Sequence, residues 1–116
     1  MAAGKRLICA PEELQEAGLG VRFEVERDGE RLPAFAIRFG GSVRAYLNRC
    51  GHIPVELDFT PGVFFDPERL YLLCSLHGAL YDPASGACVS GRCNGQGLTP
   101  LPVIECEDGI YLLDEA

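Results

Sequence analysis

The chain has 116 residues, of which 47% are apolar, and this length and composition fit one compact domain with a core of its own. Its formal net charge is −7, and the sequence shows none of the basic patches that nucleic-acid binders carry. The acidic balance fits either docking on a basic protein partner or solubility alone.

The N-terminal part of the chain shows no targeting or membrane signal. The first ten residues lack the apolar centre of a secretory signal, and no apolar run in the chain is long enough to span a bilayer. We therefore expect a soluble, cytoplasmic protein.

Residues 11–18 predict a short helical turn, which begins at Pro11, carries acidic residues in its first turn and ends at Gly18.

A meander of three strands is predicted next. Residues 21–27 alternate apolar and charged side chains, as a half-buried strand does, and an Asp-Gly turn follows them. The partner strand runs from about 33 to 39. A Gly-Gly pair then turns the chain into a third strand over 43–47.

The texture changes after residue 47, where short apolar runs alternate with prolines, glycines and both histidines. The pattern predicts an antiparallel β domain with an insert in its middle that is built from loops. The expected features are brief strands at 63–65, 70–73 and 80–81, a turn over 82–86, a glycine-rich loop over 91–97, and closing strands near 101–107 and 110–113.

Two segments, separated by 21 residues, each place one thiol and one imidazole close together. Glycines beside these residues, Gly51 and Gly78, allow tight backbone turns. Two such loops facing each other can present two thiolates to one iron and two imidazoles to a second iron of the same cluster. The candidate ligands are Cys50, His52, Cys74 and His77.

A zinc site is the chemical alternative for the same four side chains. Zinc accepts two sulfurs and two nitrogens in a tetrahedron. Zinc fingers, however, usually pair cysteine with cysteine and histidine with histidine in each half. The mixed halves of this chain, with Gly78 after the second, favour the cluster.

The Cys-x-His and Cys-x-x-His-Gly motifs, with Tyr81 and Asp82 following the second, resemble those of the Rieske iron–sulfur family. The resemblance covers most of the chain. It implies a Rieske-type [2Fe–2S] cluster held by the four candidate ligands. It also implies an all-β Rieske fold, with antiparallel base sheets and a small, loop-built cluster-binding lobe.

The resemblance also divides the chain. All of residues 1–116 would form a single Rieske-type domain. Its cluster-binding lobe would span about 48–83, and its base would consist of about 1–47 and 84–116.

Family resemblance further implies a function in electron transfer. The chain would be a ferredoxin that takes single electrons from a reductase and passes them to a terminal oxygenase or another oxidoreductase. It would have no substrate site of its own. The oxygenases of the family add a mononuclear iron that needs two further histidines and a carboxylate, and both histidines of this chain are already assigned to the cluster. Nucleic acid and membrane are not expected as partners. The alternatives are a small accessory subunit of a larger redox enzyme, like that of assimilatory nitrite reductases, and a redox or iron sensor.

The chain departs from the family's high-potential branch in two ways. The extra cysteines that clamp the ligand loops of that branch are missing, and Val55 and Leu76 or their neighbours stand there instead. Ala79 follows the His-Gly pair where that branch has a serine, whereas Tyr81 matches the tyrosine that bonds a ligand sulfur. With Gly78, these residues predict a reduction potential in the lower part of the range of about −150 to +300 mV.

The segment between the two ligand pairs is longer than is usual in the family. Residues 56–66 are expected to form an added hairpin near the cluster. If Asp58 and Asp66 lie close to the cluster, their charges would lower the potential further. The aromatic pair Phe64-Phe65 is interpreted as packing.

Four cysteines remain outside the ligand set. Cys88 and Cys93 bracket a loop that, in the family, forms a third cover over the cluster. They can form a disulfide, although a reducing cytosol favours free thiols. Cys9 and Cys106 are expected to be buried apolar fillers.

Overall fold

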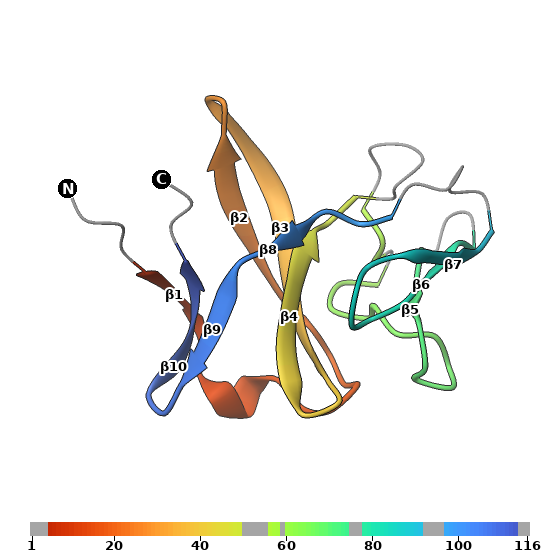
Figure 1. Cartoon of the computed structure of the whole chain (residues 1–116), viewed down its shortest axis with the longest axis horizontal. Helices are drawn as coiled ribbons and strands as arrows, with labels where there is room; N and C mark the ends of the chain where they lie inside the picture. Colours follow the sequence, from red (N-terminus) through yellow and green to blue (C-terminus); the bar gives the residue numbers. More distant parts are fainter. Residues whose placement is uncertain (1–4, 50–55, 59, 75–77, 92–96, 114–116) are drawn as a thin grey trace.

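Three antiparallel β-sheets make up most of the computed structural model, which describes residues 5–49, 56–58, 60–74, 78–91 and 97–113 (Figure 1). This confirms the predicted all-β class. The strands are β1 (Lys5–Cys9), β2 (Val21–Arg27), β3 (Glu30–Phe39), β4 (Ser42–Leu47), β5 (Leu72–Leu73), β6 (Leu80–Tyr81), β7 (Cys88–Ser90), β8 (Pro100–Leu101), β9 (Val103–Cys106) and β10 (Gly109–Leu113), and a short 3-10 helix, η1, spans Pro11–Glu13.

The strand order separates a base from a lobe. Sheet β1-β10-β9 and sheet β2-β3-β4-β8 lie side by side and form the base, and sheet β5-β6-β7 lies beyond β4 (Figure 1). The predicted meander is β2-β3-β4, and its hairpins pair residue by residue without a bulge. Strand β7 joins β6, so the sheet of the lobe continues past residue 83 to Ser90.

Strand β3 divides the hydrophobic core in two, because side chains alternate between the faces of a strand. The bulky Phe35 and Ile37 face the lobe, whereas the small Ala34 and Ala36 face the sheet of β1, β9 and β10. We call the two groups the lobe core and the base core. The lobe core is Phe35, Ile37, Tyr46, Leu57, Phe64, Phe65, Leu72, Cys74, Ala79, Tyr81 and Leu98. The base core is Cys9, Leu14, Val25, Ala34, Ala36, Val43, Ala45, Leu47, Leu101 and Ile110.

Aromatic stacking joins the lobe to β3. The ring of Phe64 lies parallel to that of Phe35, with the centroids 4.0 Å apart and the planes 12° from each other. Phe65 stacks on Phe39 in the same way, at 6.0 Å. Both phenylalanines of the pair are buried, which confirms their interpretation as packing residues.

The N-terminal prediction is only partly right. The helical turn expected over 11–18 shrinks to Pro11–Glu13, because buried Leu14 has an extended backbone. Glu16 lies outside the turn and accepts hydrogen bonds from both glycine amides of the β3–β4 turn, at 2.6 and 2.9 Å. Strand β1 was not predicted, because most of its side chains are exposed and the sequence shows little alternation there.

The strand expected near 101–107 is in fact two strands of different sheets. Strand β8 pairs with β4, and β9 pairs with β10. Pro102 separates them, and proline, which lacks an N–H, interrupts strand pairing. The carbonyl of Pro102 still accepts a hydrogen bond from Leu113. This short segment therefore connects the two base sheets.

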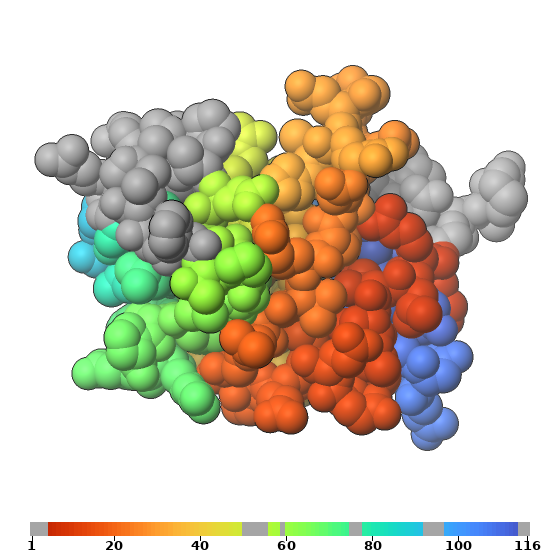
Figure 2. Space-filling view, turned by 180° about the vertical axis from the view of Figure 1, so that it is seen from behind, coloured from red at the N-terminus to blue at the C-terminus, as the bar shows by residue number. Residues whose placement is uncertain are grey.

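The added hairpin exists, but it lies later in the chain than the predicted 56–66. Residues 64–66 run antiparallel to 71–73, with Leu73 N donating to Phe64 O at 2.7 Å. Only an isolated bridge stands where a strand over 63–65 was expected. The turn before this hairpin packs against the loop before β2, where Gly20 N donates to the Gly62 carbonyl at 2.8 Å (green against orange in Figure 2).

The guanidinium of Arg38 ties three base elements together. It forms a bidentate ion pair with Glu105 of β9, in which its two terminal nitrogens lie 2.9 and 2.7 Å from the two carboxylate oxygens. It also donates to the carbonyl oxygen of Leu14, directly after η1, at 2.7 Å, and to that of Pro11 within η1, at 3.2 Å. The hydrogen bond from Arg38 is the main reason why the pKa of the Glu105 carboxyl lies below its ordinary value.

Arg38→Gln is expected to lower the free energy of unfolding by about 2 kcal/mol at neutral pH, because charge-assisted hydrogen bonds are lost in a partly buried position. The lowered pKa of Glu105 contributes stability above the unfolded-state value of about 4.3, and this stability is lost as the pH falls through the folded-state pKa. The difference in the free energy of unfolding between variant and wild type should therefore become smaller at acidic pH. Urea unfolding at about pH 7 and about pH 3.5 measures it.

Arg31→Gln is the matched control. Arg31 lies 3.6 Å from Glu24, and both side chains are well exposed. Its loss should cost no more than about 0.5 kcal/mol. Equal destabilisation by the two substitutions would show that Arg38 does not hold the base together.

Candidate metal centre

The second candidate ligand segment is a loop that is closed at its base by hydrogen bonds. Cys74 follows β5, and its amide donates to the Ala79 carbonyl at 2.9 Å, while Gly78 N donates to Cys74 O at 2.8 Å. Gly78 has φ +74°, which favours glycine. His77 and its two predecessors lie outside the described residues, but the chain that carries them leaves and returns through this tight hairpin.

Cys74 has the surroundings that a cluster ligand needs. Cys74 is fully buried and is a member of the lobe core. A cluster sulfur ligand held in such a shell is protected from water and from exchange, and burial and hydrogen bonding are the means by which a protein tunes such a centre. The donor chemistry of this position therefore fits an iron–sulfur cluster.

The first candidate ligand segment is also closed at its base. Asn48 follows β4, and its side-chain oxygen accepts a hydrogen bond from Leu57 N at 2.9 Å. Cys50 and His52 lie between these two residues in the sequence, outside the described part of the chain. Leu57 belongs to the same lobe core as Cys74. The closed ends of both loops therefore rest on one core, although the full ligand set remains a prediction.

The residues expected to tune the potential surround the second loop. Tyr81 lies in β6 and is fully buried, as is Ala79. Gly91, at the start of the glycine-rich loop, packs so closely on Ala79 that a Cβ there would lie 2.6 Å from its Cα. The third loop thus begins in direct contact with the second ligand loop. The effects of Tyr81, Gly78 and Ala79 on the potential remain predictions.

The remaining cysteines differ from one another. Cys88 is disulfide-bonded, so the expectation of a free thiol is wrong for it, and its partner lies outside the described residues. Cys9 is a buried filler, as predicted, and burial with the nearby Glu13 carboxylate raises the pKa of its thiol to about 11. Cys106 is only partly buried, contrary to prediction, because it lies on the edge strand β9, with the Lys5 ammonium 3.9 Å from its sulfur.

The two aspartates of the inserted segment have structural partners. Asp66 caps a turn by accepting from Leu70 N and Tyr71 N, at 2.9 and 3.2 Å. Asp58 is buried and accepts a hydrogen bond from the side-chain amide of Asn48 at 2.9 Å. Sequence reasoning missed Asn48, and the available signal was an amide side chain directly after an apolar strand and two residues before a candidate ligand.

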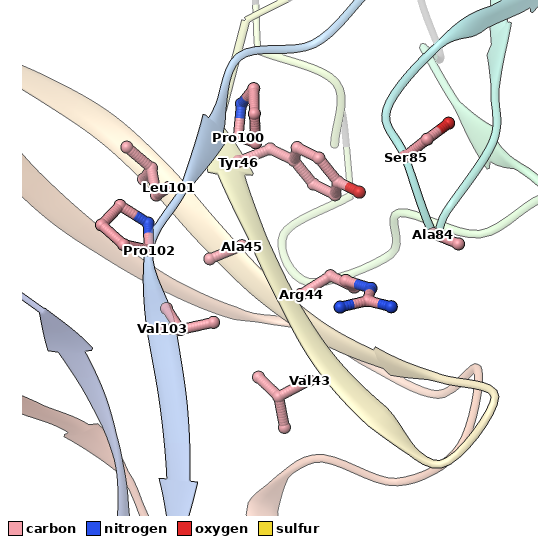
Figure 3. Close-up of a pocket in the computed structure, with 10 residues that line it drawn as sticks. All are labelled: Val43, Arg44, Ala45, Tyr46, Ala84, Ser85, Pro100, Leu101, Pro102 and Val103. Atoms are coloured by element: carbon pink, nitrogen blue, oxygen red, sulfur yellow. The ribbon is translucent and has the colours of Figure 1, made fainter.

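A groove of about 270 Å³ marks the junction between base and lobe. Its wall is formed by β4, by the strands on both sides of Pro102, and by the turn that carries Ala84 and Ser85 (Figure 3). Tyr46 crosses this junction and donates from its hydroxyl to the Pro83 carbonyl at 2.7 Å. Burial raises the pKa of Tyr46 to about 12, so the hydroxyl keeps its proton and remains a donor at neutral pH.

Two negative results concern the described residues alone. None of the helices found there is long and apolar enough to cross a membrane. The described residues also contain no group of three or more histidine, cysteine, aspartate or glutamate side chains that could hold a metal ion. The second result leaves the ligand prediction untested, because three of the four candidates lie elsewhere in the chain.

Comparisons with known proteins agree with this geometry. The Rieske [2Fe-2S] domain family matches residues 5–106. The ferredoxin of carbazole 1,9a-dioxygenase from Nocardioides aromaticivorans IC177 is 25% identical, with a TM-score of 0.71 over 93% of this chain and 95% of that one. The Sphingomonas yanoikuyae B1 ferredoxin is 22% identical, with a TM-score of 0.71 over 97% and 100%.

A larger protein shares the same fold in one part. The terminal oxygenase of carbazole 1,9a-dioxygenase from Nocardioides aromaticivorans IC177 is 20% identical, with a TM-score of 0.69 over 97% of this chain but only 30% of the oxygenase. A comparison with curated protein sequences gave no match. The similarity thus extends over the whole length of the small ferredoxins and over a minor part of the oxygenase.

Proposed function

This chain belongs to the Rieske [2Fe-2S] domain family, and on that basis we propose that it carries single electrons as a ferredoxin component for a terminal oxygenase or another oxidoreductase. The observation that carries the proposal is the family match over 5–106, joined to a fold shared with ferredoxins along their full length. The chain is a carrier rather than a substrate-converting enzyme. This full-length similarity to ferredoxins favours a carrier over an accessory subunit.

The proposed ligands are Cys50 and Cys74 for one iron and His52 and His77 for the other. When bound, the [2Fe–2S] cluster accepts and releases one electron. The chain's own contribution is to bring the two loops together on the lobe core and to exclude water from the Cys74 thiol. We also propose that the lobe, about residues 48–83, and the base form one domain.

The proposed partners are redox proteins, namely a reductase that donates electrons and an oxygenase that accepts them. A ferredoxin and an oxygenase of carbazole 1,9a-dioxygenase have been solved as a complex, and that ferredoxin shares the fold of this chain, with a TM-score of 0.70. The net charge of −7 would attract a basic docking surface. We also propose a cytoplasmic location, in which Cys9 and Cys106 keep free thiols and the disulfide bond of Cys88 is an exception to the reduced state of most cytoplasmic cysteines.

Electron paramagnetic resonance of the dithionite-reduced protein, with iron and zinc analysis of the same sample, tests the proposal. We expect about two irons per chain and a rhombic signal with a low average g value, because two imidazoles replace two thiolates on one iron. A silent spectrum together with stoichiometric zinc would overturn the cluster assignment. A resonance signal typical of a cluster with four cysteine ligands would overturn the assignment of His52 and His77 as ligands and leave the [2Fe–2S] cluster standing.

A further inference from the structure

A buried polar network lies at the base of the first ligand loop. The side chain of Asn48 is fully buried, and it donates to Asp58 Oδ1 at 2.9 Å and accepts from Leu57 N at 2.9 Å. The other oxygen of Asp58 accepts from Gly62 N, also at 2.9 Å. Together these contacts join the residue that follows β4 to the segment that returns from the loop.

A cation from the base sheet completes the network. Arg22 of β2 places its Nε 3.3 Å from Asp58 Oδ2, and a terminal nitrogen 2.5 Å from Glu56. The Asp58 side chain is fully buried, while Arg22 and Glu56 are partly exposed. The buried carboxylate therefore has an amide, a backbone N–H and a guanidinium as partners.

Such a network has one favourable arrangement. A buried amide or carboxylate is stabilising only when its hydrogen bonds are made, and leaving one unpaired is destabilising. Shifting either end of the loop would break several bonds at once. The network consequently fixes the distance between Asn48 and Leu57, which lie on either side of residues 49–56.

We propose that Asn48 and Asp58 are positioning residues, which hold the ends of the first ligand loop so that Cys50 and His52 meet the irons in a single geometry. This inference rests on the proposed function, since it concerns two of the proposed ligands. Its physical basis is the position of the network. Asn48 lies two residues before Cys50, and Asp58 lies six residues after His52.

The test compares two variants that each remove a side chain with two hydrogen bonds. Asn48→Ala removes those to Asp58 and Leu57, and Glu16→Ala removes those to Gly40 and Gly41, at the β3–β4 turn. The readouts are the line widths of the electron paramagnetic resonance signal of the reduced protein, the reduction potential, and the rate of iron loss to a chelator. Asn48→Ala should broaden the lines, shift the potential and speed iron loss by about fivefold or more, and Glu16→Ala should change none of them.

A swap of the two groups provides a rescue. Asp58→Asn alone leaves two donors facing each other in the network, and it should broaden the signal as Asn48→Ala does. Combining it with Asn48→Asp restores a carboxylate that can accept from Leu57 N and from the new amide, whose oxygen can accept from Gly62 N. The double variant should recover narrow lines and slow iron loss.

The outcomes separate this inference from the proposed function. Normal wild-type spectra with equal effects of Asn48→Ala and Glu16→Ala would overturn the positioning role and leave the cluster assignment standing. A double variant no better than Asp58→Asn would also overturn it. Wild-type protein without a cluster would overturn both. Hydrogen exchange adds a readout without iron, because Asn48→Ala should remove the protection of the Leu57 amide, and unchanged protection would count against the network.

Discussion

Cys74→Ala protein is expected to be colourless and to hold no iron after purification. The alanine removes one of the two thiolates proposed to bind the cluster, and the remaining proposed ligands could not complete the coordination of that iron. The position is fully buried in the lobe core, so no outside thiol can replace the missing sulfur. Visible absorbance and iron content per chain measure the result, and His52→Ala should behave in the same way.

Cys9→Ala is the matched control for this loss. Cys9 is also a buried cysteine, but it belongs to the base core. Its removal should leave colour, iron content and the resonance signal unchanged, while causing a modest loss of stability. Red-brown Cys74→Ala protein with an unchanged spectrum would contradict the assignment of Cys74 as a ligand.

His77→Cys is expected to retain a cluster and to lower its reduction potential by about 100 mV or more. A thiolate carries a negative charge where the imidazole was neutral, so adding an electron becomes less favourable, and four-thiolate clusters of the plant type lie near about −400 mV. A histidine ligand can release its ring proton, so we expect the wild-type potential to depend on pH and this dependence to weaken when one of the two proposed histidine ligands is replaced. Potentiometric titrations at several pH values measure both changes.

Ser75→Cys serves as the control for the added thiol. It places a cysteine in the same loop, two residues before His77, and leaves both histidines intact. Its potential and pH dependence should match those of the wild type. A His77→Cys protein with a full cluster and the wild-type potential would show that His77 does not bind iron.

Sequence patterns predicted the parts of the fold that follow local rules. The meander β2-β3-β4 was predicted from alternation and from two glycine-containing turns, and the structure confirms it. The family match confirms the Rieske resemblance that the cysteine and histidine spacing indicated. Both signals are local, because a strand's period and a ligand's spacing are written within a few residues.

Features that depend on distant partners could not be predicted. The change of sheet at Pro102 depends on which edges β4 and β10 leave open, and the apolar residues on both sides of it read as one strand. The buried pair of Asn48 and Asp58 becomes visible only when residues ten apart are brought into contact. The position of the hairpin at 64–73 depends on the stacking of Phe64 on a ring of β3.

The alternation of large and small side chains along β3 has a consequence for the maturation of the protein. Among the residues that the structure describes, every member of the base core lies outside residues 48–96, which include the proposed ligand segments. We expect iron-free chains to keep a folded platform with a loosened lobe, since metal binding stabilises the part that it touches. Iron and sulfide would then be inserted into a chain whose base is already folded and whose lobe is still loose. A damaged cluster could be rebuilt in the existing polypeptide.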